Sequence, residues 1–238
     1  MGNFACPRRR DKRRKNQNLY RLLEKGKIFE FSKMKLRKKD WSAITDFVYE
    51  LGILEKTPRS GLWFLGTGEQ SVAEHLFRTA VIGYILAKLT PKANVDRVIF
   101  LCLMHDLGEA RTSDLNYVHQ RYGRLAERDA VRDIAATLPF GKEIQDAYNE
   151  EQARETPEGK IAKDADVIEW IATLRQEEEK GNKKAASWIK GIPKRLKTPT
   201  GKKLAARIIK THPDDWWFDN KDKWFMTQDP KFRSWKKK

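Results

Sequence analysis

Apolar residues in this chain recur at the spacing of a helix, and this periodicity restricts the fold most strongly. From Ser71 to Leu89 the residues on one helical face are Val72, Leu76, Ala80, Gly83 and Ala87. A second apolar run begins near Asn94, continues to Leu107 and breaks at Gly108. No stretch alternates apolar and polar residues convincingly, as half-buried strands do. The sequence therefore predicts an all-α body.

Further helices are expected on both sides of these two. A helix capped by Asp40 or Ser42 should end near Gly52, and others are expected near 123–138, 141–153 and 158–180. Residues 56–68 are rich in turn formers and predict a loop. Gly66-Thr67-Gly68 lacks a preceding strand and a third glycine, so it is interpreted as a cap for the next helix. At 238 residues the chain is long enough for one well-buried core.

The net charge of +16 is unevenly distributed along the chain. Residues 1–39 carry 15 Lys/Arg against 3 Asp/Glu, and residues 180–238 carry 18 against 5. The middle, 40–179, carries 16 Lys/Arg against 25 Asp/Glu, so an acidic body lies between two basic ends. Such ends are usually solvated. A nucleic-acid surface is the functional alternative, because five of the eight tryptophans accompany the lysines in 180–238.

The N-terminal residues and the cysteines bear on location. Residues 1–17 are interpreted as a solvated basic arm, and 18–39 as containing a short docked helix. Met1-Gly2 with Cys6 and a basic run allows a remoter alternative, a doubly acylated anchor. No apolar run approaches the ~20 residues that span a bilayer. Two distant cysteines, with Cys102 as a buried apolar residue, indicate a reducing, cytoplasmic setting.

Polar residues that interrupt apolar helices indicate where the chemistry lies. His75 lies on a helix with apolar neighbours, and His105-Asp106 closes the apolar run VIFLCLM. Asp166 lies in a helix that Ile161, Val167 and Ile168 mark as at least half buried. A buried carboxylate requires a partner, and a cation is a natural one. Two imidazoles with two carboxylates suit Mn, Fe, Co, Ni or Zn.

Each of these residues also has a purely structural explanation. His75 could bond a backbone carbonyl, Asp106 could cap the turn at Gly108, and Asp166 could pair with Lys163. Glu109 adds weight to the chemical interpretation, because it follows Asp106 by three residues. A continued helical turn would point Glu109 to the same side, where it could hold or deprotonate a metal-bound water.

Three segments in order, SVAEH, LMHDLGEARTSDL and KIAKDADVIEW, resemble the HD-domain phosphohydrolases, and within them the 5'-deoxynucleotidase-like branch. The resemblance covers roughly residues 36–180. It implies one divalent metal ion (Mn, Co, Zn, Fe, Ni or Mg), bound by His75, His105, Asp106 and Asp166, with Asp164 as the alternative to Asp166. With only His119 and His212 remaining, a second metal is not expected.

The same resemblance implies the roles of four further residues. Glu109 is the expected catalytic residue, Arg59 the phosphate ligand and Asp114 the contact to the sugar. Trp63 is the expected aromatic contact, although Leu62 stands between it and Gly61 where the family often has Gly-Trp. The structural alternatives are a surface role for Arg59 and a helix cap at Leu115 for Asp114.

The sequence thus predicts an HD-domain helical bundle with basic N- and C-terminal extensions. The expected divisions are a basic extension 1–33, an HD phosphohydrolase domain 34–180 and a basic, Trp-rich extension 181–238. The expected protein is a cytoplasmic, homodimeric hydrolase of nucleoside 5'-monophosphates that forms no membrane span. The alternative is an HD scaffold that binds nucleic acid through its basic ends, with weak or no hydrolysis.

Overall fold

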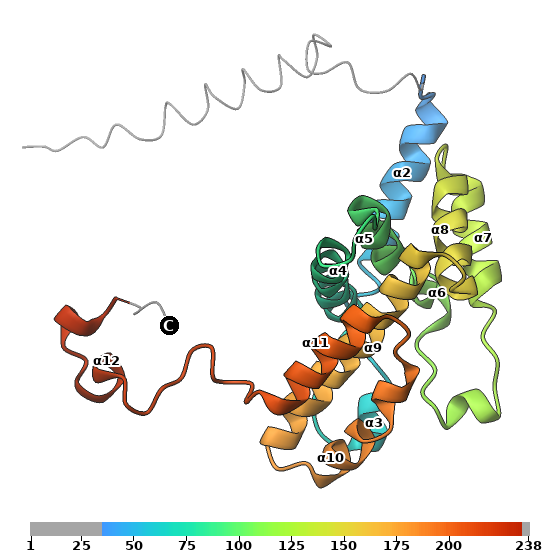
Figure 1. The fold of residues 1–238 in the computed structure, drawn as a ribbon. Coiled ribbons are helices and arrows are strands. Elements are labelled where there is room, and N and C mark those ends of the chain that lie inside the picture. The colour runs from blue at the N-terminus through green and yellow to red at the C-terminus, as the bar shows by residue number, and fades with distance from the viewer. Residues whose placement is uncertain (1–34, 235–238) are drawn as a thin grey trace, which may run out of the picture. The chain divides into compact units, whose positions relative to one another are not determined.

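The computed structural model describes residues 35–234, and helices dominate them (Figure 1). These residues contain no β-strand, and only an isolated antiparallel bridge joins Pro58 and Ser71. The predicted all-α class is confirmed. The chain divides after Arg37, and the description concerns the unit from Lys38 onward. The predictions for 1–33, including the acylation site at Met1-Gly2 and Cys6, lie outside the described residues.

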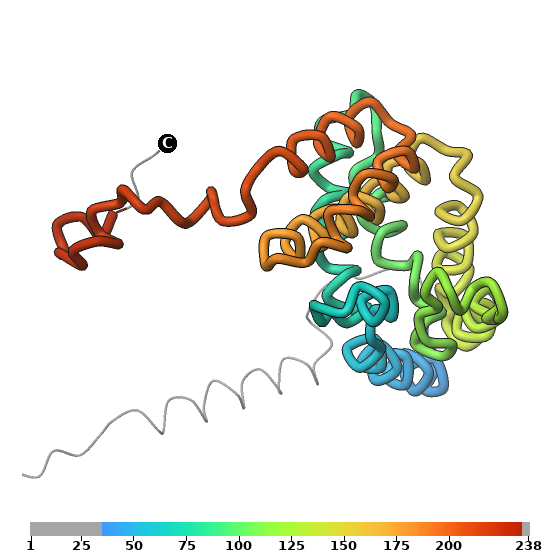
Figure 2. The backbone as a smooth tube through the Cα atoms, turned by 90° about the horizontal axis from the view of Figure 1, so that it is seen from below, coloured from blue at the N-terminus to red at the C-terminus, as the bar shows by residue number. Residues whose placement is uncertain are grey.

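The organising element is α9 (Pro157–Glu179). Its first turn is set by Pro157 and by Thr156, whose side chain accepts a hydrogen bond from the Gly159 amide. Five other helices pack against α9: α4 (Val72–Lys88), α5 (Val95–Met104), α8 (Gly141–Ala153), α10 (Lys183–Ile189) and α11 (Pro199–Lys210). Figure 2 shows the same bundle from below. Because neighbours surround it, α9 is buried on several faces, which explains its lack of a single apolar stripe.

Two hydrophobic clusters form the core. The first joins α4, α5 and α9 through Leu86, Leu101 and Ile168, all with no exposed surface. The second lies around α7 (Glu127–Thr137) and α8 and includes Val72, Leu107, Val131 and Ile134. Phe100 and Met104 of α5 pack against both clusters, so α5 links them. Cys102 is 1% exposed, as predicted for an apolar core residue.

The predicted helices are present, with shifted ends. Helix α2 (Lys38–Leu51) and helices α4, α8 and α9 match the expected spans closely, whereas α7 begins at Glu127 rather than near 123. The predicted loop 56–68 contains the short helix α3 (Gly61–Leu65). Shorter elements complete the chain: α6 (Glu109–Thr112), η1 (His119–Arg121), η2 (Ile192–Arg195), α12 (Lys223–Thr227) and η3 (Pro230–Phe232).

The cap of α4 differs from the prediction. Ser71 is the N-cap, and it exchanges hydrogen bonds with Glu74 in a capping box. Gly66 instead ends α3 with a left-handed φ of 87°. The glycines therefore serve the turn between α3 and α4, and a capping box three residues later starts α4.

The hydrophobic core includes residues after position 180, where the HD domain was predicted to end. Ala185, Ile189, Ile192, Leu196 and Ala205 are all buried in the first cluster. By contrast, no residue is buried among the described positions 211–234. Charge follows the same division, because 180–210 holds 11 Lys/Arg and no Asp/Glu, whereas 211–234 holds 4 against 5. The basic part of the C-terminal region is therefore the part that packs on α9.

Candidate metal centre

Three helices bring four side chains together. His75 comes from α4, His105 and Asp106 follow the last turn of α5, and Asp166 comes from α9. His75 Nε2 lies 3.3 Å from His105 Nε2, 3.5 Å from Asp106 Oδ2 and 3.3 Å from Asp166 Oδ1. His105 Nε2 lies 3.1 Å from Asp106 Oδ2 and 4.0 Å from Asp166 Oδ1. His75, His105 and Asp106 therefore meet at one point, and Asp166 Oδ1 approaches them from the side of His75.

The outer nitrogens of both imidazoles are already used. His75 Nδ1 lies 2.7 Å from Glu169 Oε2, and His105 Nδ1 lies 2.8 Å from the Cys102 carbonyl oxygen. Both partners only accept hydrogen bonds, so each Nδ1 carries a proton. In the neutral rings each Nε2 then presents a lone pair toward the other and toward two carboxylate oxygens. Such a cluster of acceptors is unfavourable unless positive charge lies among them.

The ionisation of these groups reflects the same excess of negative charge. Burial lowers the pKa of His105, but Asp106 and Asp166 outweigh burial and raise that pKa to about 9. Burial would raise the pKa of Asp166, yet Lys163 and His75 hold it well below its ordinary value. Positive charge is therefore favoured at His105 Nε2, as a proton or a metal ion.

The spacing of the donors fits a single ion. Two donors about 2.1 Å from one ion, at angles of 90° to 109°, lie about 3.0–3.4 Å apart. Four of the five measured distances, 3.1 to 3.5 Å, are close to this range, and the fifth, 4.0 Å, corresponds to a wider angle. His75, His105 and Asp106 form a group that could hold a metal ion. These three residues thus fit one divalent cation, and Asp166, whose Oδ1 lies 3.3 Å from His75 Nε2, is the proposed fourth ligand.

Glu169 supports the centre and was not predicted from the sequence. One of its oxygens accepts from His75, and the other accepts from Gln70, Arg78 and Thr173. Burial would raise the pKa of Glu169, but His75 and Arg78 lower it to about 2. A carboxylate that receives the outer N–H of a ligating histidine fixes the ring and increases its basicity. The signal in the sequence is the position of Glu169 three residues after Asp166, on a buried face.

The two aspartates of the KDAD segment have separate roles. Asp164 is fully buried and turned toward α11, where it accepts from the Lys197 and Thr198 amides at 2.8 and 2.7 Å. Asp166 Oδ2 accepts from Lys163 Nζ at 2.6 Å, while its Oδ1 faces His75. The structural alternative for Asp166 and its proposed ligand role therefore use different oxygens.

Arg59 and Asp114 lie beside the centre. Arg59 Nη1 donates to Asp106 Oδ2 at 3.2 Å, which places the guanidinium next to the four donors. Burial lowers the pKa of Arg59, but Asp106 and Asp114 outweigh it and raise that pKa above its ordinary value. Asp114 accepts from the Ser60 amide at 2.7 Å and so ties its own loop to the Arg59 loop. No described helix begins at Leu115, where a cap by Asp114 was the alternative.

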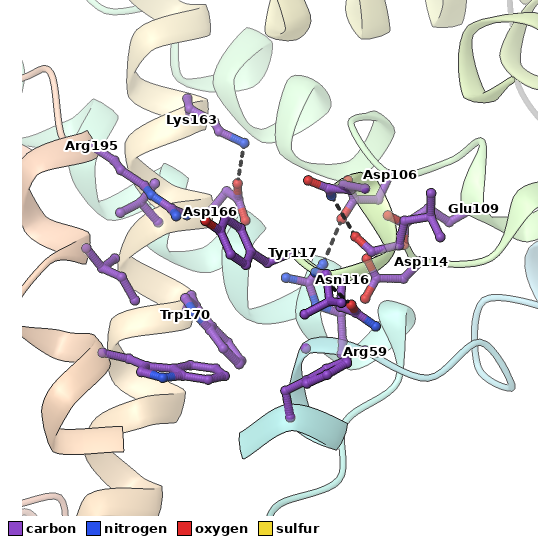
Figure 3. A pocket seen from close by; sticks show the side chains of 18 of the residues that line it. Arg59, Asp106, Glu109, Asp114, Asn116, Tyr117, Lys163, Asp166, Trp170 and Arg195 are labelled. Carbon is purple, nitrogen blue, oxygen red and sulfur yellow. Dashed lines mark hydrogen bonds and ion pairs between the residues drawn. The ribbon is translucent and has the colours of Figure 1, made fainter. Parts of the chain in front are cut away.

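A cavity lies beside the four side chains, and Asp106 and Asp166 are among the residues that line it. Glu109, at the start of α6, also lines this cavity (Figure 3). It is 6% exposed, and its Oε2 has no hydrogen-bond partner among the described residues. Burial, Asp106 and Asp114 together raise the pKa of Glu109 to about 10. A cation nearby would favour its carboxylate form. An unpartnered, buried carboxyl oxygen is therefore available to a water or substrate atom beside the centre.

Trp63 does not reach the cavity. Its side chain is 61% exposed, and its ring meets His119 edge-on at 6.2 Å, whereas the next residue, Phe64, lines the cavity. His119 receives a hydrogen bond from Asn116, and His212 contacts Glu179, so neither lies with the four donors. Trp170, Trp188 and Arg195 line the cavity but were not predicted as site residues.

These helices and donors have known counterparts. The family model described as "HD domain" matches residues 51–208 of this chain. The chain belongs to the HD domain family. The resemblance stated from the three sequence segments is confirmed.

In this HD domain protein, no helix among residues 35–234 has the length and apolar character needed to cross a membrane.

Three curated relatives similar to this HD domain protein are named 5'-deoxynucleotidases. The 5'-deoxynucleotidase HDDC2 of Xenopus laevis is 30% identical over 146 residues, which cover 58% of this chain and 70% of the relative. That of Danio rerio is 28% identical over 139 residues, covering 56% and 68%. The 5'-deoxynucleotidase hdd1 of Schizosaccharomyces pombe is 27% identical over 150 residues, covering 59% and 75%.

Solved structures share the fold. A conserved hypothetical protein from Pyrococcus furiosus is 25% identical with a TM-score of 0.61, covering 70% of this chain and 99% of its own. A predicted metal-dependent phosphohydrolase from Magnetospirillum magnetotacticum is 20% identical with a TM-score of 0.60, covering 73% and 92%. The second similarity concerns the fold alone.

Proposed function

We propose that this HD domain protein is a metal-dependent phosphohydrolase that releases phosphate from nucleoside 5'-monophosphates. The observation that carries the proposal is the convergence of two bare imidazole nitrogens and two carboxylate oxygens beside Arg59 and Glu109. The names of the curated relatives, 5'-deoxynucleotidases, support this substrate class.

The residues around the centre would have different roles in phosphoryl transfer. A bound divalent ion would supply Lewis-acid stabilisation of the phosphoryl charge and would lower the pKa of a nearby water. His75, His105, Asp106 and Asp166 would hold that ion. Arg59 would hold the phosphate oxygens, and Glu109 would orient the attacking water and accept its proton. The water oxygen bonds to phosphorus, the bond to the 5'-oxygen breaks, and that oxygen takes up a proton.

The cavity supports the proposed role of Asp114 more strongly than that of Trp63. Asp114 lines the cavity and retains a carboxylate for a sugar hydroxyl. Trp63 lacks a position in the cavity, so an aromatic contact to substrate falls more readily to Phe64. The mixed N/O donor set favours Mn, Fe, Co, Ni or Zn over Mg as the ion.

We infer a homodimer and a cytoplasmic location on more general grounds. Helix α4 exposes an apolar stripe of Phe77, Val81, Tyr84 and Ile85, with exposures of 70%, 44%, 45% and 39%. Such a stripe is typical of an association surface. Light scattering should give twice the chain mass for the protein and the single mass for Val81→Glu.

The inferred cytoplasmic location rests on Cys102, because its buried free thiol is in keeping with a reducing compartment.

A second candidate function is an HD scaffold that binds nucleic acid with weak or no hydrolysis. The observation in its favour is the stretch 180–210, with 11 Lys/Arg and no acidic residue. A purely scaffolding role would not require a ligand set with a supporting Glu169 and an unpartnered Glu109. The geometry therefore favours the enzyme.

The deciding experiment is phosphate release from ribo- and deoxyribonucleoside monophosphates. Metal-stripped protein would be supplied with Mn, Co, Mg or Zn in turn. We expect metal-dependent release that falls at least a hundredfold in Asp106→Ala and Glu109→Ala. Asp146→Ala, which removes an exposed carboxylate of α8, is the matched control and should remain active. Absence of release with every metal, from folded protein that still binds an ion, would favour the scaffold.

A further inference from the structure

The cavity beside the candidate metal centre extends well past it. Its volume is about 970 Å³, near the upper end of the roughly 300–1,000 Å³ found for ligand pockets. In Figure 3, Asp106, Glu109 and Asp114 lie on one side, and Trp170 and Arg195 lie on the other. The space exceeds what a single phosphate needs. The chemistry of the second side should therefore indicate what the rest of the substrate is.

Trp170 places an aromatic ring next to the metal ligands. It follows Asp166 by four residues, so it lies about 6 Å farther along the same face of α9. It packs against Trp188 of α10 with ring centroids 6.3 Å apart, and both rings are half-buried walls of the cavity. Stacking on aromatic rings binds a base with little dependence on its identity. A nucleotide whose phosphate lies at the centre can thus place its base beside Trp170.

Arg195 lines the cavity without a carboxylate partner among the described residues, and Arg154, which also lines it, lies near Glu151 without forming an ion pair. Both side chains are exposed, and within the described residues neither forms an ion pair. Arg78 and Arg97, by contrast, are each paired with a glutamate. A free guanidinium beside a cavity is a ready phosphate ligand. The cavity therefore offers positive charge for a second anionic group, beyond the phosphate held at the centre.

The basic stretch 180–210 contributes part of the cavity wall. Residues 180–210 contain 11 Lys/Arg and no Asp/Glu, and Trp188, Ile192 and Arg195 of this stretch line the cavity. The body that precedes it is acidic over 40–179. Aromatic rings beside basic side chains are the combination with which proteins bind single-stranded nucleic acid. Double-stranded nucleic acid is not expected to bind in this way, because its bases are stacked on one another and are not free to stack on Trp170.

We propose that the centre acts on the 5'-phosphorylated end of a single-stranded oligonucleotide. The terminal base stacks on Trp170, and Arg195 binds the first internucleotide phosphate. This inference rests on the proposed function and extends its substrate. Water attacks the terminal phosphorus, the bond to the 5'-oxygen breaks, and that oxygen takes a proton. The products are inorganic phosphate and an oligonucleotide with a 5'-hydroxyl group, and the internucleotide bonds stay intact.

The test compares substrates of increasing length on the metal-loaded, full-length protein. Thymidine 5'-monophosphate, 5'-phosphorylated dithymidine and the 5'-phosphorylated pentamer would be assayed for phosphate release. We expect kcat/KM to be at least tenfold higher for the dimer than for the monomer, mainly through KM. This advantage should shrink as salt increases, because the added contact is ionic. In Arg195→Ala the dimer should lose at least tenfold more kcat/KM than the monomer does.

Arg132→Ala is the matched control, since Arg132 is an exposed arginine of α7 that lies outside the basic stretch and does not line this cavity. It should retain the dimer's advantage. A second readout is independent of turnover: in Glu109→Gln, binding of the dimer should quench tryptophan fluorescence, and Trp170→Phe should reduce that quenching.

The outcomes separate the two proposals. Equal or better hydrolysis of the monomer, or equal losses on both substrates in Arg195→Ala, would overturn the oligonucleotide inference alone. Failure to release phosphate from any of the three substrates with any metal would contradict the proposed function itself.

Discussion

Glu169 shows how a residue outside the ligand set can determine whether the centre works. It touches no atom expected to contact the ion, yet it holds His75 through one oxygen at 2.7 Å and is itself held by Gln70, Arg78 and Thr173. Such an arrangement fixes both the tautomer and the direction of the imidazole. Glu169 is thus a positioning residue.

Replacing this carboxylate should weaken metal binding with little change in fold. For Glu169→Gln we expect a loss of about 10–100-fold in metal affinity, the usual effect of removing such a partner. Titration calorimetry with Mn or Co would measure it. Glu155→Gln removes an exposed carboxylate between α8 and α9 and should bind as the unchanged protein does. Unaltered affinity in Glu169→Gln would show that His75 is oriented without Glu169.

The neighbouring aspartates provide a second prediction at this scale. Asp166→Ala should abolish metal binding, because Asp166 faces both imidazoles. Asp164→Ala should keep metal binding but lower the free energy of unfolding by about 1–3 kcal/mol, since the Lys197 and Thr198 amides lose their acceptor. Denaturant unfolding and metal titration on both variants distinguish the roles. The reverse pattern would assign the ligand to Asp164.

The sequence indicated the proposed ligands more clearly than the residues that support them. His105 and Asp106 stand out because they end an apolar run, and Asp166 because apolar residues flank it. Glu169 and Trp170 gave weaker signals, only their spacing of three and four residues from Asp166, since their importance depends on which face of α9 meets α4 and which meets the cavity. Helical spacing fixes neighbours along one helix but not the partner helix. Trp63 illustrates this limit, because its position in the chain did not fix the direction of its side chain.

At the scale of elements, α4 and α5 approach closely at Gly83. A Cβ atom on Gly83 would lie 2.6 Å from Cys102 Sγ and 3.2 Å from Val98 Cγ1. The helices could not keep this contact if position 83 carried a side chain. His75 and His105 belong to these two helices, so the close packing also sets the distance between the imidazoles.

Gly83→Ala should therefore destabilise the protein, although alanine is the better helix former. Overpacking in a core costs about 1–3 kcal/mol, which exceeds the roughly 1 kcal/mol that alanine gains in a helix. Adding Cys102→Ala removes the clashing sulfur and should recover part of the loss. Urea unfolding of the two single variants and the double variant measures the coupling. If the changes in unfolding free energy of the two single variants simply add in the double variant, the clash with Cys102 is not the cause, and α4 and α5 move apart at another contact.

The elements were more predictable than their ends and partners. Periodic apolar residues located α4, because burial of one face requires that pattern. Helix α3 was missed because five residues give too short a period to recognise. The sequence left the role of α10 and α11 open, since their lysines suggested a solvated tail and their tryptophan a helix packed on the body, and their apolar faces pack on α9.

At the scale of the whole molecule, two truncations should behave differently. Ending the chain after Lys210 removes no buried residue among those described, so the melting temperature should change little. Ending it after Lys180, the predicted domain boundary, removes Ala185, Ile189, Ile192, Leu196 and Ala205 from the core. We expect that shorter chain to aggregate or to unfold without cooperativity. A stable, cooperative 1–180 fragment would instead support the predicted boundary.

The order in which the ligands occur along the chain has a consequence for synthesis in the cell. His75 lies on α4 and Asp166 far downstream on α9, so the complete donor set exists only after most of the body has been translated. At about 5–20 residues per second, this interval is on the order of ten seconds. During it, the nascent chain offers incomplete, weakly selective ligand sets. Which ion the finished protein carries should therefore depend on the free metal pool that it meets after release from the ribosome.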